Sequence, residues 1–315
     1  MRVVSEAEIA AALDFPALID ALADAFRAEI AAPPRHHVAI PRPGAEATLL
    51  LMPAWTGEGE GSFIGVKVIA IFPANLARGI PSLSGSYMLL SGETGLPLAI
   101  MDGGLLTRWR TAAASALAAR YLARADASRH LIVGAGALAP FLARAYSAVR
   151  PIREISIWNR TARRAEEVAA ALNADGLPAR AVRDLGAAVR SADVVTCLTG
   201  AEAPLVHGAW LKPGMHLDLV GGFKPNMREA DDEALGRTRI YVDTRGALKE
   251  AGDLLGPLQR GVISETDIQG DLFELCRGRA QARRSNEEIT LFKSAGTAIE
   301  DLATAILVWR RLRPI

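Results

Sequence analysis

The sequence contains few cysteines and no strong excess of charge. Cys197 and Cys276 are its two cysteines; they form no CxxC pair and have no His or Cys at the spacing of a metal site. We therefore expect two reduced thiols, no disulfide framework and no metal centre. The formal charge is +1 over 315 residues, so no broad basic field is present that would attract nucleic acid.

Long apolar runs are also missing. No uncharged stretch approaches the ~20 residues that cross a bilayer. The N-terminal region carries Glu6, Glu8 and Asp14 where a signal peptide would be apolar. We therefore expect a cytoplasmic protein that binds no membrane.

Residues 1–125 contain helices followed by short strands. Ser5 and Glu8 have the spacing of a capping box, and further helices are expected from about Pro16 and over residues 107–125, with Thr107 as N-cap. Between Val38 and Met101 the pattern changes to short β-like runs separated by turn signals such as "SGETG". This pattern predicts an antiparallel meander.

From residue 126 onward, short apolar strands alternate with helical stretches. Alternation of this kind predicts a parallel sheet wrapped by helices, which is an α/β fold. Near the C-terminus, Ile299, Leu302, Ile306 and Trp309 form one stripe of an amphipathic helix.

A glycine-rich turn follows the first strand of the α/β region. In "LIVGAGALA", Gly134 allows the tight turn, Gly136 allows close approach of a pyrophosphate, and Ala139 lets the following helix pack against the strand. Helix N-termini also supply N–H donors for phosphate. The strand, loop, helix and second strand together predict a Rossmann-type dinucleotide site, with Ala137 as a further loop contact.

The end of the next strand decides which dinucleotide fits. An acidic residue would usually grip the ribose 2′-hydroxyl of NAD about 20 residues after the glycine loop. Here the sequence reads Asn159, Arg160, Thr161, a cation and hydroxyl that suit a 2′-phosphate. We therefore predict NADPH in preference to NADH; the alternative is an arginine on a solvated turn.

The motifs together resemble the ornithine cyclodeaminase/mu-crystallin family. The resemblance runs in order over nearly the whole chain, through "GVKVIAIFPANLARGIPSLSG", "RTAAASALAA", "GAGALA", "WNRT", "ADVVTCLT" and "FKSAGTAIEDLA". It implies a homodimer in which the dinucleotide domain, residues 126–294, is inserted in an α+β substrate and dimerisation domain, residues 1–125 plus 295–315. It also implies that Thr111, Val220 and Ser294 contact the cofactor, although Ser294 could instead be a helix cap.

The resemblance assigns the substrate carboxylate to Lys67, Arg110 and Arg35. Lys67 interrupts the apolar strand "FIGVKVIAIF", where a lysine is costly unless it has an anionic partner or reaches water at a sheet edge. Arg110 is expected in the first turn of its helix, where a cation opposes the helix dipole unless an anion is shared. Arg35 has the alternative of being an ordinary loop charge.

Two positions depart from the family pattern. Leu138 replaces the glutamine that the family usually carries in the phosphate loop. Phe223 follows the two glycines of "VGGF" where a cyclodeaminase carries an aspartate for the substrate amine, and Asp218, earlier in the strand, is expected to be structural. We therefore predict NAD(P)H-dependent reduction of a small cyclic imino acid, Δ1-pyrroline-2-carboxylate or Δ1-piperideine-2-carboxylate, with Lys67 and Arg110 as catalytic residues and Phe223 lining the substrate site. The alternatives are an ornithine cyclodeaminase, an alanine dehydrogenase and a mu-crystallin-like NADPH-binding protein.

Overall fold

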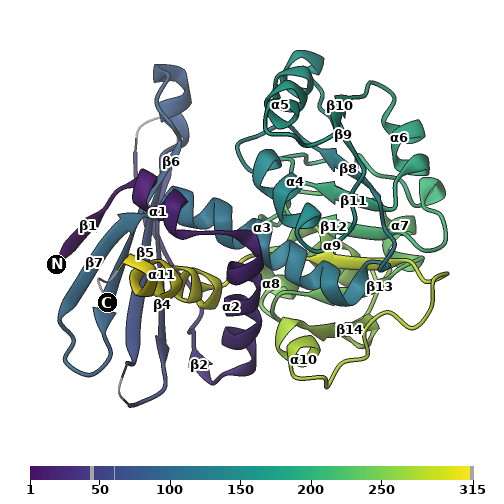
Figure 1. Cartoon of the computed structure of the whole chain (residues 1–315). Helices are drawn as coiled ribbons and strands as arrows, with labels where there is room; N and C mark the ends of the chain where they lie inside the picture. The colour runs from purple at the N-terminus through teal and green to yellow at the C-terminus, as the bar shows by residue number, and fades with distance from the viewer. Residues whose placement is uncertain (43–45, 60, 313–315) are drawn as a thin grey trace. The chain divides into compact units, whose positions relative to one another are not determined.

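Figure 1 shows the computed structural model, which describes residues 1–42, 46–59 and 61–312. The chain divides into two compact units: Met1–Thr111 with Thr297–Ile315, here called the outer unit, and Ala112–Gly296, here called the inserted unit. The sequence analysis placed the domain bounds elsewhere, at residues 1–125 plus 295–315 and residues 126–294. Those bounds stay a prediction.

The outer unit is built on a mixed sheet. Its strand order is β1-β7-β6-β5-β4-β2, with β3 also paired to β4. The pairs from β3 to β7 are antiparallel, which confirms the predicted meander. The bounds are β1 Arg2–Val4, β2 Ile30–Ala31, β3 His36–Ile40, β4 Ala47–Thr56, β5 Phe63–Ile71, β6 Leu83–Ser91 and β7 Pro97–Asp102.

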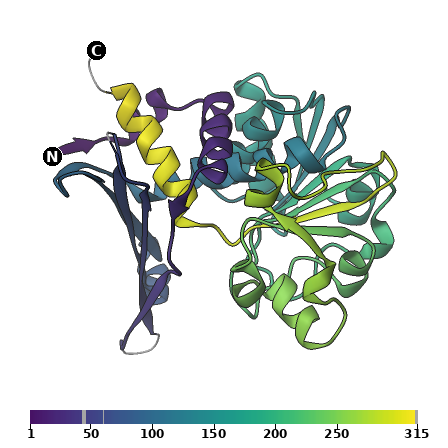
Figure 2. The ribbon, with the colours of Figure 1, turned by 90° about the horizontal axis from the view of Figure 1, so that it is seen from below.

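Helices cover one face of this sheet. α1 (Glu6–Ala12) begins with the predicted capping box between Ser5 and Glu8. α2 (Phe15–Arg27) buries the three predicted side chains Leu18, Leu22 and Phe26. α11 (Ala298–Leu312) packs on β4, β5 and β6 and against α2, and Figure 2 shows it lying along the sheet.

The alanine-rich helix α3 (Gly103–Leu122) begins four residues before the predicted N-cap. The Leu105 N–H donates to Asp102 Oδ1 (2.5 Å), whereas the Thr107 hydroxyl donates to the Gly103 carbonyl inside the helix. The prediction of Thr107 as N-cap was therefore wrong, because Asp102 at the end of β7 supplies the cap one turn earlier. Arg110 consequently lies beyond the first turn.

The inserted unit contains an all-parallel sheet with the order β10-β9-β8-β11-β12-β15-β13-β14. The chain runs outward from β8 to β10 and then returns to β11 beside β8, so a topological switch point lies between β8 and β11. Right-handed crossovers place the helices of the two halves on opposite faces. The predicted doubly wound parallel sheet is confirmed.

The bounds in this unit are as follows. The strands are β8 Arg129–Val133, β9 Glu154–Trp158, β10 Ala179–Ala181, β11 Val194–Cys197, β12 His216–Leu219, β13 Arg239–Val242, β14 Ile268–Asp271 and β15 Thr290–Lys293. The helices are α4 Ala139–Ser147, α5 Ala162–Ala174, α6 Leu185–Ser191, α7 Asp232–Gly236, α8 Ala247–Glu250, α9 Gly252–Gln259 and α10 Leu272–Cys276. No helix in the described ranges is long and apolar enough to span a membrane.

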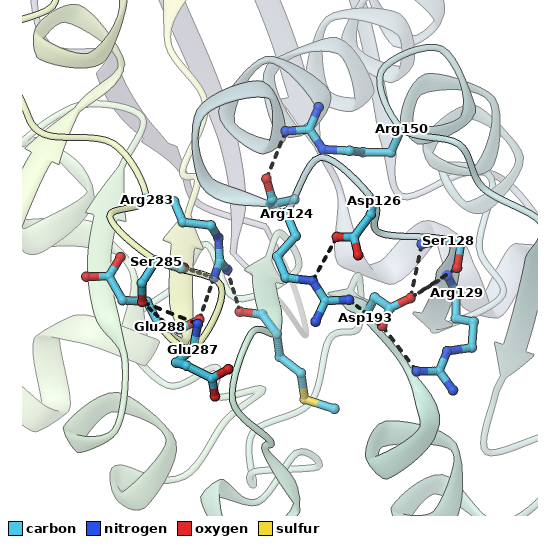
Figure 3. Close-up of polar contacts among 12 residues, drawn as sticks. Arg124, Asp126, Ser128, Arg129, Arg150, Asp193, Arg283, Ser285, Glu287 and Glu288 are labelled. Carbon is cyan, nitrogen blue, oxygen red and sulfur yellow. Dashed lines mark hydrogen bonds and ion pairs between the residues drawn. The ribbon is translucent and has the colours of Figure 1, made fainter.

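Arginines fix the C-terminal end of α3 within the inserted unit (Figure 3). Arg150 donates to three main-chain carbonyls at the end of α3, and Arg283 Nε donates to a fourth, that of Leu122. Cations are favourable there because the last carbonyls of a helix are otherwise unpaired and carry the negative end of the dipole. Figure 3 also shows Asp193 between Arg124 and Arg129, where it accepts the main-chain N–H at the start of β8.

Candidate functional sites

The glycine loop joins β8 to α4 in the inserted unit. Gly134 has φ +118°, and a Cβ there would lie 2.9 Å from the Leu198 carbonyl oxygen, so the position requires glycine. No described atom lies within 4 Å of a Cβ built on Gly136, which leaves that backbone open to a ligand. Ala139 is the buried first residue of α4. The local geometry is that of a phosphate-binding turn.

A pocket opens at this loop. Gly134, Gly136, Asn159 and Arg160 line it, together with the loop after β11. Asn159 links the glycine loop to the segment before α5. Its Oδ1 accepts from the Ala135 N–H (3.2 Å), and its Nδ2 donates to the Thr161 carbonyl (3.0 Å). An aspartate could accept the first bond but could not donate the second.

The pocket carries a second arginine that the sequence analysis missed. Arg164 lines it with Arg160 and is the third residue of α5, which begins two residues after Arg160. The described lining residues include no Asp or Glu. Thr161 is the residue that precedes α5, and Ala137 is exposed at the tip of the glycine loop. The arginines of "NRTARR" directly after the strand were the signal that could have identified Arg164.

A buried charge cluster lies in the outer unit. Lys67 Nζ lies 2.6 Å from Asp301 Oδ2, and Arg110 Nε lies 3.2 Å from Asp301 Oδ1. Arg110 also contacts a second carboxylate, with its Nη1 2.7 Å from Glu300 Oε2. Lys67, Glu300 and Asp301 are 0% exposed and Arg110 is 8% exposed. The two cations and two carboxylates balance formally. We call these four residues the buried quartet.

Lys67 reaches the quartet from the middle of the sheet. In β5 it pairs with Met52 on β4 and with Tyr87 on β6, both buried on the same face. It is therefore not an edge-strand lysine that reaches water. A buried lysine needs an anionic partner, and here that partner is Asp301. Burial lowers the pKa of Lys67 to about 8, although the Asp301 carboxylate raises it in part.

Arg110 has a different setting from the one predicted. Arg110 is the eighth residue of α3, beyond the first turn, so the helix dipole does not explain its need for an anion. The anions are Glu300 and Asp301 at the start of α11, where carboxylates are favoured by the N-terminal dipole. Arg35 immediately precedes β3, in which the next residue, His36, pairs with Leu51. The antiparallel register thus brings Arg35 toward Met52 and the row that contains Lys67.

The model of the ornithine cyclodeaminase/mu-crystallin family matches residues 1–314. The chain belongs to this family.

Three known proteins are similar to the chain over most of its length. A Δ1-pyrroline-2-carboxylate reductase of Paracoccus denitrificans is 41% identical over 84% of the chain and 83% of that protein. The structure of the Thermococcus litoralis Δ1-pyrroline-2-carboxylate reductase in complex with NADH and L-proline is 32% identical, with a TM-score of 0.92 over 99% of this chain and 97% of that one. An archaeal alanine dehydrogenase dimer with bound NAD is 30% identical, with a TM-score of 0.90 over 98% and 95%.

The remaining residues that the family resemblance assigned lie apart from the pocket lining. Thr111 and Val220 are largely buried, and the Ser294 N–H donates to the Leu219 carbonyl (3.2 Å) beside the end of β15. Ser294 is not a helix cap, because α11 begins only at Ala298. Phe223 is 43% exposed in the loop after β12. Their roles toward cofactor and substrate stay predictions.

Asp218 and the two cysteines lie in the interior. Asp218 is fully buried in β12 and accepts a hydrogen bond from the Tyr146 hydroxyl (2.9 Å), and burial raises its pKa to about 7. Cys197 and Cys276 are free, buried thiols. Within the described ranges, no group of three or more His, Cys, Asp or Glu side chains is placed to hold a metal ion.

Proposed function

We propose that the protein reduces a small cyclic imino acid, Δ1-pyrroline-2-carboxylate or Δ1-piperideine-2-carboxylate, to the L-amino acid by hydride transfer from a nicotinamide dinucleotide. The observation that carries the proposal is the presence of Lys67 and Arg110 together in a buried quartet in a chain 41% identical to a Δ1-pyrroline-2-carboxylate reductase. The dinucleotide supplies the hydride. The protein's task is to hold the substrate carboxylate and orient the C=N carbon.

The charge of the quartet favours a substrate that carries a positive charge beside its carboxylate. Lys67 and Arg110 are already balanced by Glu300 and Asp301. A third anion alone would add an uncompensated charge to a buried site, which is costly. A cyclic imino acid with a protonated imine is net neutral, whereas pyruvate is not. The quartet therefore supports imine reduction over direct recognition of a 2-oxo acid.

The loop after β12 favours the same reaction over cyclodeamination. Phe223 stands where the cyclodeaminases carry an aspartate, and a phenyl ring neither accepts an ammonium group by hydrogen bonding nor activates water. Dinucleotide oxidation with each imino acid or with pyruvate plus ammonia, beside ammonia release from ornithine with NAD, separates the three reactions. Turnover in the ornithine assay alone would replace the proposed reaction by ornithine cyclodeamination. Absence of turnover in every assay would favour a binding protein of the mu-crystallin kind.

We further propose NADPH as the preferred cofactor. The two solved relatives described above contain NADH or NAD, neither of which carries a 2′-phosphate. In this chain the end of β9 offers Arg160 and Arg164 at the pocket and no carboxylate among the described lining residues. Two guanidinium groups suit a phosphate dianion.

Replacing Arg160 by alanine is expected to raise the KM for NADPH about tenfold, since a hydrogen bond to a charged group contributes ~1.5–3 kcal/mol. The KM for NADH is expected to change less than about twofold, because NADH has no 2′-phosphate to lose a contact. Initial rates with both dinucleotides measure the two constants. The matched control is Arg163→Ala, whose side chain is exposed and pairs with Glu167 outside the pocket lining. An unchanged KM for NADPH would refute the proposed phosphate contact.

The outer unit also supports a homodimer. Trp55, Val68 and Met88 lie on the sheet face opposite Lys67 and are 42%, 37% and 36% exposed. Contiguous exposed apolar surface of this kind usually marks a protein interface. A second copy of the chain is the proposed partner, and the archaeal relative was solved as a dimer.

Val68→Glu is expected to convert the dimer to monomer, because the introduced carboxylate would be buried without a partner at the interface. Sedimentation velocity measures the change in mass. Leu96→Glu is the control, since Leu96 is exposed in the turn between β6 and β7 and not on that face. A wild-type chain that sediments as a monomer would exclude the proposed assembly.

A further inference from the structure

A fully buried carboxylate beneath the dinucleotide pocket is not used by the proposed reaction. Glu229 precedes α7 and is 0% exposed. Its Oε1 accepts from the Thr199 N–H (2.6 Å) and the Thr199 hydroxyl (2.9 Å). Its Oε2 accepts from the N–H groups of Gly221 (2.8 Å) and Gly222 (3.3 Å). One side chain thus holds two separate loops.

These two loops lie at the carboxyl ends of adjacent strands. Thr199 follows β11 and lines the pocket, and Gly221 and Gly222 follow β12. The loop after β11 also faces the glycine turn, because a Cβ on Gly134 would meet the Leu198 carbonyl. In open parallel sheets the ligand binds at this edge, beside the switch point. Glu229 therefore sets the position of a pocket wall without lining the pocket itself.

A second layer holds Glu229 in place. Asp253 Oδ1 accepts from the Glu229 N–H (2.7 Å) and the Ala230 N–H (3.3 Å), and Lys293 Nζ lies 3.1 Å from Asp253 Oδ2. Asp253 and Lys293 are 0% exposed. Asp253 thus connects Lys293, at the end of β15, to the main chain of Glu229. Buried polar networks of this kind restrict the conformation of the residues they bind, here Glu229.

The two glycines of the second loop fit this arrangement closely. A Cβ on Gly221 would lie 2.1 Å from the Thr199 carbonyl oxygen, and one on Gly222 would lie 2.3 Å from Asp253 Oδ2. Neither position has room for a side chain. The pair "GG" in this chain is therefore required by the Glu229 network and not only by loop flexibility.

The network requires an acceptor-only group at position 229. The Glu229 carboxylate is the acceptor in all four of its side-chain hydrogen bonds given above. Burial raises the pKa of Glu229, while Lys293 opposes that effect. A protonated acid, or a glutamine amide, would direct a donor at one of the N–H groups. The geometry is thus satisfied by the carboxylate and by no isosteric neutral group.

We propose that Glu229 is a positioning residue of the dinucleotide site, whose carboxylate holds the loops after β11 and β12 in the conformation that binds the cofactor. The inference rests on the proposed function in one respect, that the pocket takes a nicotinamide dinucleotide. Because Glu229 holds the wall after β11 and not Arg160 at the end of β9, its loss affects NADPH and NADH alike.

The test is Glu229→Gln, with dissociation constants for NADPH and NADH measured by titration calorimetry. Both constants are expected to rise by about tenfold, the loss of a charge-assisted hydrogen bond, and by the same factor. Amide hydrogen exchange is expected to quicken at Thr199, Gly221 and Gly222. The control is Glu233→Gln, an exposed residue on α7 that pairs with Arg237.

A lower unfolding midpoint with unchanged dissociation constants would overturn the proposal and leave Glu229 a purely structural residue. Thr199→Val gives a second route if Glu229→Gln does not fold. It removes the hydroxyl that donates to Glu229 (2.9 Å) and accepts from the Ala201 N–H (3.4 Å), and it keeps the Thr199 N–H bond to Glu229. A rise of about threefold is expected in both constants. Unchanged constants in that variant would equally overturn the proposal. If the wild type binds no dinucleotide, this inference and the proposed function both fail. Dinucleotide binding without imino-acid turnover refutes the proposed reaction alone.

Discussion

Replacing Lys67 by methionine is expected to lower kcat/KM for the cyclic imino acid by roughly 10²–10³-fold, since truncating one partner of a buried charge pair costs ~2–5 kcal/mol. The physical reason is the loss of the cation proposed to hold the substrate carboxylate, in a place that water does not reach. Methionine keeps the length and apolar character of the lysine stem. Initial-rate kinetics at saturating NADPH measure the change.

Two comparisons identify the cause of that loss. The dissociation constant for NADPH, measured by titration calorimetry, is expected to stay within about twofold of the wild type, because Lys67 belongs to the outer unit and the glycine loop to the inserted one. Lys212→Met, on the exposed surface, is the matched control and is expected to retain full activity. A Lys67→Met enzyme with kcat/KM within about threefold of the wild type would exclude Lys67 from the substrate site.

The pH profile follows from the same residue. Lys67 has a pKa of about 8 in the folded protein, so it is cationic below that pH and loses its charge above it. The proposed grip on the substrate carboxylate weakens as the pH rises through about 8. Because the guanidinium of arginine stays charged throughout this range, Lys67→Arg is expected to move the decline in kcat/KM to higher pH. The titratable substrate imine is the same in both enzymes, so the difference between the two profiles isolates Lys67.

Asp301→Ala is expected to lower the free energy of unfolding by about 3–5 kcal/mol, the cost of breaking a buried ion pair by removing one partner. Asp301 is the carboxylate that Lys67 and Arg110 share. Its removal leaves the fully buried Lys67 ammonium without its 2.6 Å partner. Urea unfolding at pH 7 measures the loss. Asp126→Ala is the control, because the Asp126 side chain is 76% exposed and its pair with Arg124 contributes little.

The double variant Lys67→Met/Asp301→Ala distinguishes an unpaired charge from lost packing. If the buried ammonium causes the instability, removing it is expected to restore part of the free energy of unfolding, so the double variant is more stable than Asp301→Ala. The pKa of Lys67 in the folded protein lies below the ordinary lysine value of 10.5. The unfolded chain therefore binds more protons between these values, and the Lys67 contribution to stability increases as the pH rises through that window. Additive losses in the double variant would contradict this account of the quartet.

Much of the fold follows from local patterns in the sequence. The alternating runs between Val38 and Met101 became β4 to β7, and the strand, glycine loop and helix became β8 and α4. Three strands were missed. β10, β14 and β15 read "ARA", "IQGD" and "TLFK", and the charged or polar residues in them mask the short apolar run that marked the other strands. The place of β15 between β12 and β13 is a tertiary feature that no local pattern encodes.

The candidate sites were predictable to a different degree. Lys67 in an apolar strand indicated a buried anionic partner, but Asp301 lies 234 positions further along a sequence whose spacing gives no hint of contact. The signal that could have identified it is "AIEDLATAI", where two acids interrupt an apolar helix. Glu229 carried no such signal, because it stands in the charged run "READDE", which is typical of a solvated surface. Its burial comes from the two loops that fold over it.

The most direct test of the proposed function is the oxidation of NADPH, followed spectrophotometrically, with Δ1-pyrroline-2-carboxylate as substrate. The predicted result is formation of L-proline in a one-to-one ratio with NADPH consumed, a higher kcat/KM with NADPH than with NADH, and no ammonia release from ornithine. Δ1-Piperideine-2-carboxylate under the same conditions shows which ring size the site prefers. Ammonia release from ornithine without reduction of either imine would contradict the account.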